Sequence, residues 1–147
     1  MKKKVLSVAV IVILLALIVC IILYFRPLTF SVSEDSELNV ILNTFVVIYD
    51  KPDIEVAKYK DITAEQKQEI LALFAQYPYT RTLTTPFSDG SMDGIGTQQL
   101  SLYAFSESGE STTIHLTSSG QIVVDSKNYK MENAQQLIDQ IIDVLTK

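Results

Sequence analysis

The sequence predicts an α+β fold, in which an N-terminal transmembrane helix is followed by a two-layer domain with two helices packed on an antiparallel sheet. Three observations predict it. The first is an uncharged apolar run near the N-terminus, and the second is a series of short segments in which apolar and polar residues alternate. The third is a pair of segments with apolar residues at helical spacing. Because the turns between the alternating segments are short, neighbouring strands should pair antiparallel.

The apolar run spans residues 5–25 and contains no charged side chain, with Ser7 as its one strongly polar residue. About 20 apolar residues at roughly 1.5 Å of rise each match the ~30 Å hydrocarbon core of a membrane. Three lysines at positions 2–4 precede the run, and only Arg26 follows it closely. The positive-inside bias therefore places the N-terminus in the cytoplasm and the C-terminal domain outside the cell membrane.

A cleaved secretory signal and a lipoprotein are the two alternatives to an uncleaved single-pass anchor. A signal peptide has a shorter apolar core and small residues at the cleavage site, whereas bulky residues fill this run up to Phe25. Lipidation would require small residues before Cys20, and Val19 is too large. The signal-anchor interpretation fits better, with Cys20 as a small apolar residue inside the span.

Three regions follow along the chain. Residues 1–26 are expected to be a lysine tip and a transmembrane signal-anchor, residues 27–37 a polar spacer, and residues 38–147 the extracytoplasmic α+β domain. Cys20 is the one cysteine, which excludes an intrachain disulfide and a cysteine-based metal site. Beyond the anchor, acidic residues exceed basic ones, so nucleic acid is not an expected partner. No cofactor is expected either.

Alternation of apolar and polar residues predicts the strands. The first is long, over residues 38–49, and its last part, residues 45–49, is apolar on both faces, as in a strand covered on both sides. Residues 54–59 would form the second arm of a hairpin. In the segment 99–105, Tyr103 and Phe105 fall on the face opposite Leu100 and Leu102. Further strands are predicted over residues 81–85, 112–117, 121–125 and 129–131.

Two amphipathic helices complete the predicted domain. Thr63 and Gln66 fit a capping box at the start of the first helix, which Pro78 ends. Asn133 should cap the second helix, with Gln136 three residues further on. The apolar stripes at helical spacing are Ile70, Leu71, Phe74 and Tyr77 in the first helix and Leu137, Ile138, Ile141 and Leu145 in the second.

Three short motifs suggest a family: Tyr77-Pro78-Tyr79-Thr80-Arg81, Phe87-Ser88-Asp89 and Asn128-Tyr129-Lys130. Together they resemble small uncharacterised extracytoplasmic domains of Gram-positive bacteria, the group called domain of unknown function 5301. The resemblance extends over most of the region after the anchor and implies an anchored or secreted bacterial protein. It implies no activity and no catalytic residues.

One loop rich in Asp and Gly is the best candidate for a metal site. Asp89, Ser91 and Asp93 place oxygen-bearing side chains at alternate positions before Gly94, as at the start of a calcium-binding loop. Leu100, however, stands where such a loop requires a bidentate glutamate. Because Asp and Gly are also the usual turn-forming residues, a plain turn is the favoured alternative.

His115, the one histidine, is the obvious residue to consider for catalysis. It alternates with Ile114 and Leu116 in a predicted strand, and the sequence selects no nucleophile or orienting acid around it. No nucleophile elbow and no zinc-protease motif occur. We therefore assign no catalytic residue, and a non-enzymatic role is favoured.

Tyr77, Tyr79 and Arg81 form the preferred contact surface, because Tyr and Arg are favoured at binding hot spots. The alternative is that these tyrosines cap the edge of the core. The leading hypothesis is a membrane-anchored extracytoplasmic binding or interaction module, whose partner is an envelope protein or a cell-wall component. A small envelope hydrolase and a cation-binding or sensor accessory protein are the two other hypotheses.

Overall fold

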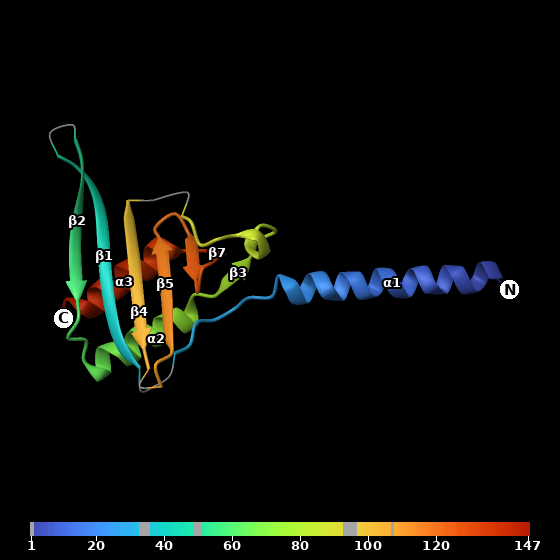
Figure 1. The fold of residues 1–147 in the computed structure, drawn as a ribbon, viewed down its shortest axis with the longest axis horizontal. Helices are drawn as coiled ribbons and strands as arrows, with labels where there is room; N and C mark the ends of the chain where they lie inside the picture. The colour runs from blue at the N-terminus through green and yellow to red at the C-terminus, as the bar shows by residue number, and fades with distance from the viewer. Residues whose placement is uncertain (1, 33–35, 49–50, 93–96, 107) are drawn as a thin grey trace.

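The computed structural model describes the chain except for residues 1, 33–35, 49–50, 93–96 and 107. For residues 2–9, 47–48 and 51–52 it describes the backbone but not the side chains. Within the described residues, seven strands form one sheet. Figure 1 shows helices behind this sheet and the N-terminal helix extending away from it. The elements in chain order are α1 Lys2–Tyr24, β1 Glu37–Ile48, β2 Lys51–Tyr59, α2 Ala64–Gln76, β3 Tyr79–Arg81, the 3₁₀ helix η1 Thr85–Phe87, β4 Gln98–Phe105, β5 Ser111–Thr117, β6 Gln121–Val124, β7 Lys127–Met131 and α3 Ala134–Leu145.

The sheet is antiparallel throughout, and its strands lie in the order β2-β1-β4-β5-β6-β7-β3. Helices α2 and α3 lie on one face of it (Figure 1). The predicted α+β class, with an antiparallel sheet that carries two helices, is confirmed. Strands β2 and β3 are the two edges, so the first hairpin and the short third strand lie at opposite ends of the sheet.

The core lies between the sheet and the two helices. Alternate residues of β1, β4, β5 and β6 point toward the helices. Each aliphatic side chain that is fully buried in this way stabilises the fold by about 1.5–3 kcal/mol. Five residues of the predicted helix stripes, Ile70, Phe74, Leu137, Ile138 and Ile141, are fully buried, whereas Leu71, Tyr77 and Leu145 are only partly buried against the core. Val144, which was not predicted, is buried at the end of α3. The largest fully buried side chains include Phe74, Ile70, Leu100, Leu102, Ile114, Leu116, Ile122, Leu137, Ile138 and Ile141.

The two helix starts differ. At α2 the predicted capping box is confirmed: the Thr63 hydroxyl accepts the N–H of Gln66 at 3.2 Å, and the Gln66 side chain accepts the N–H of Thr63 at 3.1 Å. At α3, Asn133 occupies the N-cap position as predicted, but the predicted side-chain cap is wrong, because the Asn133 side chain makes no capping bond. Asn133 has a left-handed backbone with φ of 56°, whereas a side-chain cap requires an extended backbone at that residue.

The predicted strand over residues 81–85 is also wrong. Strand β3 ends at Arg81, and η1 begins at Thr85. Pro86 explains the difference, because a proline has no N–H for a strand ladder and its fixed φ suits a helical turn.

The segment expected as a polar spacer contributes to the domain. The Leu28 N–H donates to the Tyr79 carbonyl at 2.8 Å, and the Tyr79 N–H donates to the Leu28 carbonyl at 2.9 Å. Phe30 is buried and packs edge-to-face on Phe74, with 5.4 Å between the ring centres. Sequence alternation did not reveal these contacts, since both depend on elements that lie about 50 residues away in the chain.

The last part of β1 and the first part of β2 project beyond the other strands of the sheet (Figure 1). Strand β1 pairs with β4 from Glu37 to Thr44, and the Phe45 N–H still donates to the Thr97 carbonyl at 2.9 Å. From Val46 to Ile48 the described pairing of β1 is with β2. Phe45 and Val46 are consequently only half-buried, so the prediction of a strand covered on both faces is wrong for them. The rest of the predicted 45–49 segment lies outside the described side chains.

Helix α1 points away from the domain, and nearly all of its described side chains from Val10 to Leu23 are apolar and exposed. Within the described part of the chain, no helix combines the length and the apolarity that a membrane span requires. Membrane insertion stays a prediction.

Candidate functional site

The face of the sheet that carries no helix displays the alternate residues of the strands. Ile41, Ser101, His115 and Val123 are consecutive cross-strand partners on β1, β4, β5 and β6. Neighbouring partners in an antiparallel sheet lie about 5 Å apart, so these side chains form one row across the face. We call this surface the helix-free face.

His115 lies at the centre of that row. Its Nδ1 lies 2.8 Å from the Ser101 hydroxyl, and its ring packs edge-to-face on Tyr103 with 5.8 Å between the centres. Burial lowers the pKa of His115 from its ordinary value of 6.5, because desolvation disfavours the charged imidazolium. Ser101 is only 4% exposed. The centre of the helix-free face is therefore a neutral, hydrogen-bonded pair at neutral pH.

A hollow of about 400 Å³ opens beside His115. The segment after η1 forms one wall: the Asn128 side chain donates to the Ser91 carbonyl at 2.6 Å, and the Asn128 N–H donates to the Ser88 hydroxyl at 2.9 Å. Val123 lines this hollow together with Asp89 and Gly90, and it is only 3% exposed although no helix covers its face. The hollow is lined by Asp89, Gly90, Thr113, His115, Val123, Asp125 and Ser126.

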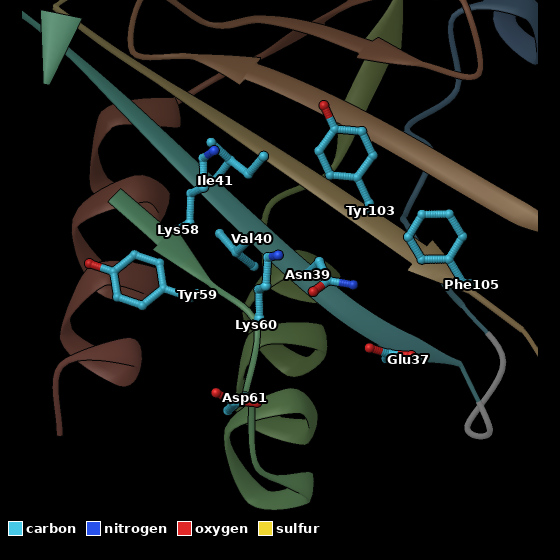
Figure 2. Close-up of a pocket in the computed structure, with 10 residues that line it drawn as sticks. All are labelled: Glu37, Asn39, Val40, Ile41, Lys58, Tyr59, Lys60, Asp61, Tyr103 and Phe105. Carbon is cyan, nitrogen blue, oxygen red and sulfur yellow. The ribbon is translucent and has the colours of Figure 1, made fainter. Parts of the chain in front are cut away.

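A second hollow, of about 490 Å³, lies where β4, β1 and β2 run side by side, and Figure 2 shows the side chains around it. Tyr103 and Phe105 come from β4, Ile41 from β1 and Lys58 from β2. The Phe105 side chain is 48% exposed. The full lining is Glu37, Asn39, Val40, Ile41, Lys58, Tyr59, Lys60, Asp61, Tyr103 and Phe105.

Tyr103 links the two hollows, because it lines the second and packs on His115 in the first. Apolar surface continues on β2, where Ile54 and Val56 are each about half exposed. The helix-free face thus combines a polar centre with an aromatic and aliphatic side. Tyr103 and Phe105 were not among the predicted site residues. The alternation of β4, which turns them away from Leu100 and Leu102, is the sequence signal that could have identified them.

The calcium candidate forms a turn. The Asp89 carboxylate accepts the N–H of Ser91 at 2.9 Å, and this hydrogen bond lowers the pKa of Asp89 below its usual range. The Ser91 carbonyl accepts hydrogen bonds from Gln121 and Asn128. Asp93 lies outside the described residues. Across the described residues, no group of three or more His, Cys, Asp or Glu side chains is placed to hold a metal ion. The Asp89–Ser91 hydrogen bond is what the plain-turn alternative requires.

The predicted tyrosine contact surface is used inside the protein. Tyr79 is buried and packs edge-to-face on Tyr129 with 5.0 Å between the ring centres. Burial also raises the pKa of the Tyr79 phenol. The Tyr77 hydroxyl donates to the Gln140 side chain on α3 at 3.0 Å. These contacts agree with the alternative in which both tyrosines cap the edge of the core.

Arg81, the third residue of that surface, contacts the end of α1. Its Nη1 donates to the Tyr24 carbonyl at 3.2 Å, and its guanidinium carbon lies 5.6 Å from the centre of the Tyr24 ring. Arg81 therefore joins the N-terminal helix to the domain, and the candidate binding surface shifts to the helix-free face.

No protein-family model, no curated protein and no solved structure matches the chain. The resemblance to extracytoplasmic domains of Gram-positive bacteria stays a prediction.

Proposed function

We propose that the protein is a membrane-anchored extracytoplasmic binding module that presents its helix-free face to an envelope protein or a cell-wall component. The observation that carries the proposal is the hollow bordered by Tyr103 and the half-exposed Phe105. Large aromatic side chains at a surface favour contact sites, because they bury much area at little cost in conformational entropy.

The anchor in this proposal is α1. It rests on the uncharged run of residues 5–25, on the three lysines before it and on the exposed apolar side chains from Val10 onward. In water, such a length of exposed aliphatic surface is unfavourable, whereas hydrocarbon removes that cost. The lysines keep the N-terminus in the cytoplasm and place the domain outside the cell membrane.

The second hollow combines aromatic surface with charged side chains, so it suits a partner that has both apolar and polar groups. Its volume falls within the ~300–1,000 Å³ typical of ligand sites. Tyr103 and Phe105 offer ring surface, and Lys58 and Glu37 offer charges of both signs at the border. Such a surface can stack on a ring or an aliphatic side chain and fix its orientation through polar groups at the rim.

Site-specific photocrosslinking in living cells tests the proposal. A photoreactive phenylalanine analogue would replace Phe105 in the full-length protein, and a matched control would carry it at Gln68, which is exposed on the outer side of α2. We expect a discrete adduct from position 105 that position 68 does not give. The proposal fails when position 105 gives no adduct, or when both positions give the same adducts.

A second candidate function is a small envelope hydrolase, favoured by the 2.8 Å contact between Ser101 and His115. A serine beside a neutral imidazole is the pairing that nucleophilic catalysis uses, and Asp89 and Asp125 line the same hollow. Two features oppose it. The contact is made by Nδ1, the nitrogen that faces the carboxylate in a catalytic triad, and Ser101 is almost fully buried.

A fluorophosphonate probe, which reacts with activated serines, separates the two functions. Labelling of the wild-type protein that is lost in both Ser101→Ala and His115→Ala would establish an activated serine. We expect no labelling, in agreement with the burial of Ser101.

A further inference from the structure

The C-terminal end of α1 is fixed to the β3 edge of the sheet. The Tyr24 hydroxyl donates to the Thr82 carbonyl at 3.1 Å, and Arg81 donates back to the Tyr24 carbonyl at 3.2 Å. These two hydrogen bonds run in opposite directions between the same two short segments. They hold the last turn of the helix against the end of β3.

The chain that leaves α1 reinforces this attachment. Only residues 25–27 separate the helix from Leu28, which makes two backbone hydrogen bonds to Tyr79, at 2.8 and 2.9 Å. Four Cα–Cα steps join Tyr24 to Leu28, and an extended chain covers at most about 14 Å in four steps. Strand β3 therefore lies directly beside the point where α1 ends, as Figure 1 also shows.

The segment after β3 carries two strongly exposed apolar side chains, Leu83 at 78% and Phe87 at 89%. Thr85 between them is buried, and its hydroxyl accepts the Thr82 N–H at 2.8 Å and donates to the Asn128 carbonyl at 2.6 Å. The hydrogen bond from Thr85 to Asn128 thus attaches this segment to β7, while its large apolar side chains are exposed to solvent. Such high exposure of a Leu and a Phe on a segment whose backbone is held in place is unfavourable in water.

We propose that Leu83 and Phe87, together with Phe25 at the end of α1, insert into the interfacial layer of the membrane around the exit of α1. This inference rests on the proposed membrane anchor. Its occupant is lipid, because exposed Phe25 directly follows the apolar helix and exposed Leu83 directly follows Thr82, which accepts a hydrogen bond from Tyr24 at the end of that helix. Phe87 is exposed on the same segment as Leu83. Aromatic and aliphatic side chains favour this layer, and the exposed Arg26 places a positive charge at headgroup level.

The insertion would fix the orientation of the domain. Strands β3 and β2 are the opposite edges of seven strands, and a spacing of about 4.8 Å per strand separates the edges by roughly 30 Å. With β3 at the lipid surface, the β2 hairpin stands away from it, and the helix-free face stands side-on to the membrane, open to partners.

The absence of tryptophan from the sequence makes a sharp test available. In Phe87→Trp, the new indole is the sole tryptophan and reports on the proposed contact. The matched control is Ile54→Trp, a half-exposed apolar position on β2 at the opposite edge. Both full-length proteins would be reconstituted into bilayers whose lipids carry bromine, a fluorescence quencher, near the headgroup end of the acyl chains.

We expect brominated lipid to remove most of the Phe87→Trp emission and to leave that of Ile54→Trp unchanged, with Leu83→Trp as an independent second reporter. A protein that resists extraction by alkaline carbonate is anchored in the bilayer. For such a protein, unquenched tryptophan emission at both 87 and 83, or equal quenching at 87 and 54, overturns the inference. Release of the protein by carbonate instead overturns the anchor, so the two failures are distinguishable.

Discussion

The two faces of the sheet are built from the same strands but have different properties. On β4 and β5, the buried residues that face the helices are apolar, and four of them, Leu100, Leu102, Ile114 and Leu116, have no exposed surface. Among the residues between them, Tyr103 and His115 are half-buried on the helix-free face and Phe105 is exposed, whereas Ser101 and Thr117 are buried polar residues. Alternation along a strand therefore assigns one set of positions to stability and leaves the other set available for contacts. Substitutions on the two faces should therefore differ in how much they lower the free energy of unfolding.

The largest expected effect comes from a matched pair of phenylalanines. Phe74→Ala on α2 should lower the free energy of unfolding by about 3–5 kcal/mol, because it leaves a cavity in the core. Phe105→Ala on the helix-free face should cost less than about 1 kcal/mol, since the ring is already half in solvent. Denaturant unfolding of the detergent-solubilised full-length variants measures both. Equal losses would contradict the division into two faces.

A second pair tests the covered part of the helix-free face. Val123, which lines the first hollow beside Asp89 and Gly90, is only 3% exposed, whereas Val56 on the same face is half exposed. Val123→Ala removes two buried carbon atoms and should cost about 2 kcal/mol, at ~0.8 kcal/mol for each buried CH₂ group plus a small cavity. Val56→Ala should stay within about 0.5 kcal/mol. A loss at Val56 as large as that at Val123 would show that the exposed strand carries more of the stability than its burial indicates.

The smallest expected effect is a pH dependence at the centre of the helix-free face. The folded protein holds the pKa of His115 below 6.5, so the unfolded chain binds the proton more readily. Stability should therefore be at its full value above pH 6.5 and fall as the pH drops below it, until the folded-state pKa is reached. Because His115 is the one histidine, His115→Gln should flatten the thermal unfolding midpoint between about pH 7 and about pH 5. A slope that persists in this variant would assign the dependence to other groups.

Local signals predicted the parts of the fold that depend on neighbouring residues. The capping box of Thr63 and Gln66 involves four consecutive residues, so the sequence alone is enough to identify it. The stripes of α2 and α3 and the alternation of β4 and β5 follow from the repeat of each element. The cap at Asn133 failed because the turn out of β7 imposes a left-handed backbone that composition does not reveal.

Features that depend on distant pairing were not predictable in this way. Tyr79 and Arg81 were chosen for their residue types, but β3 pairs with β7 about 50 residues further on, and that pairing buries Tyr79. The contact of Ser101 with His115 likewise depends on the register between β4 and β5. The burial of Phe30 requires the chain after α1 to return to the β3 edge, although its surroundings in sequence are polar.

The central claim is a protein tethered by α1 with its domain outside the cell membrane, and site-specific labelling tests it most directly. Cys20 is the one cysteine, so Cys20→Ser combined with Glu110→Cys leaves one thiol, on an exposed turn between β4 and β5. We expect a membrane-impermeant maleimide to label this thiol in intact cells, and the full-length protein to stay in the membrane pellet after carbonate washing. A thiol that reacts only after the cells are opened, or a protein found in the soluble fraction, would contradict the claim.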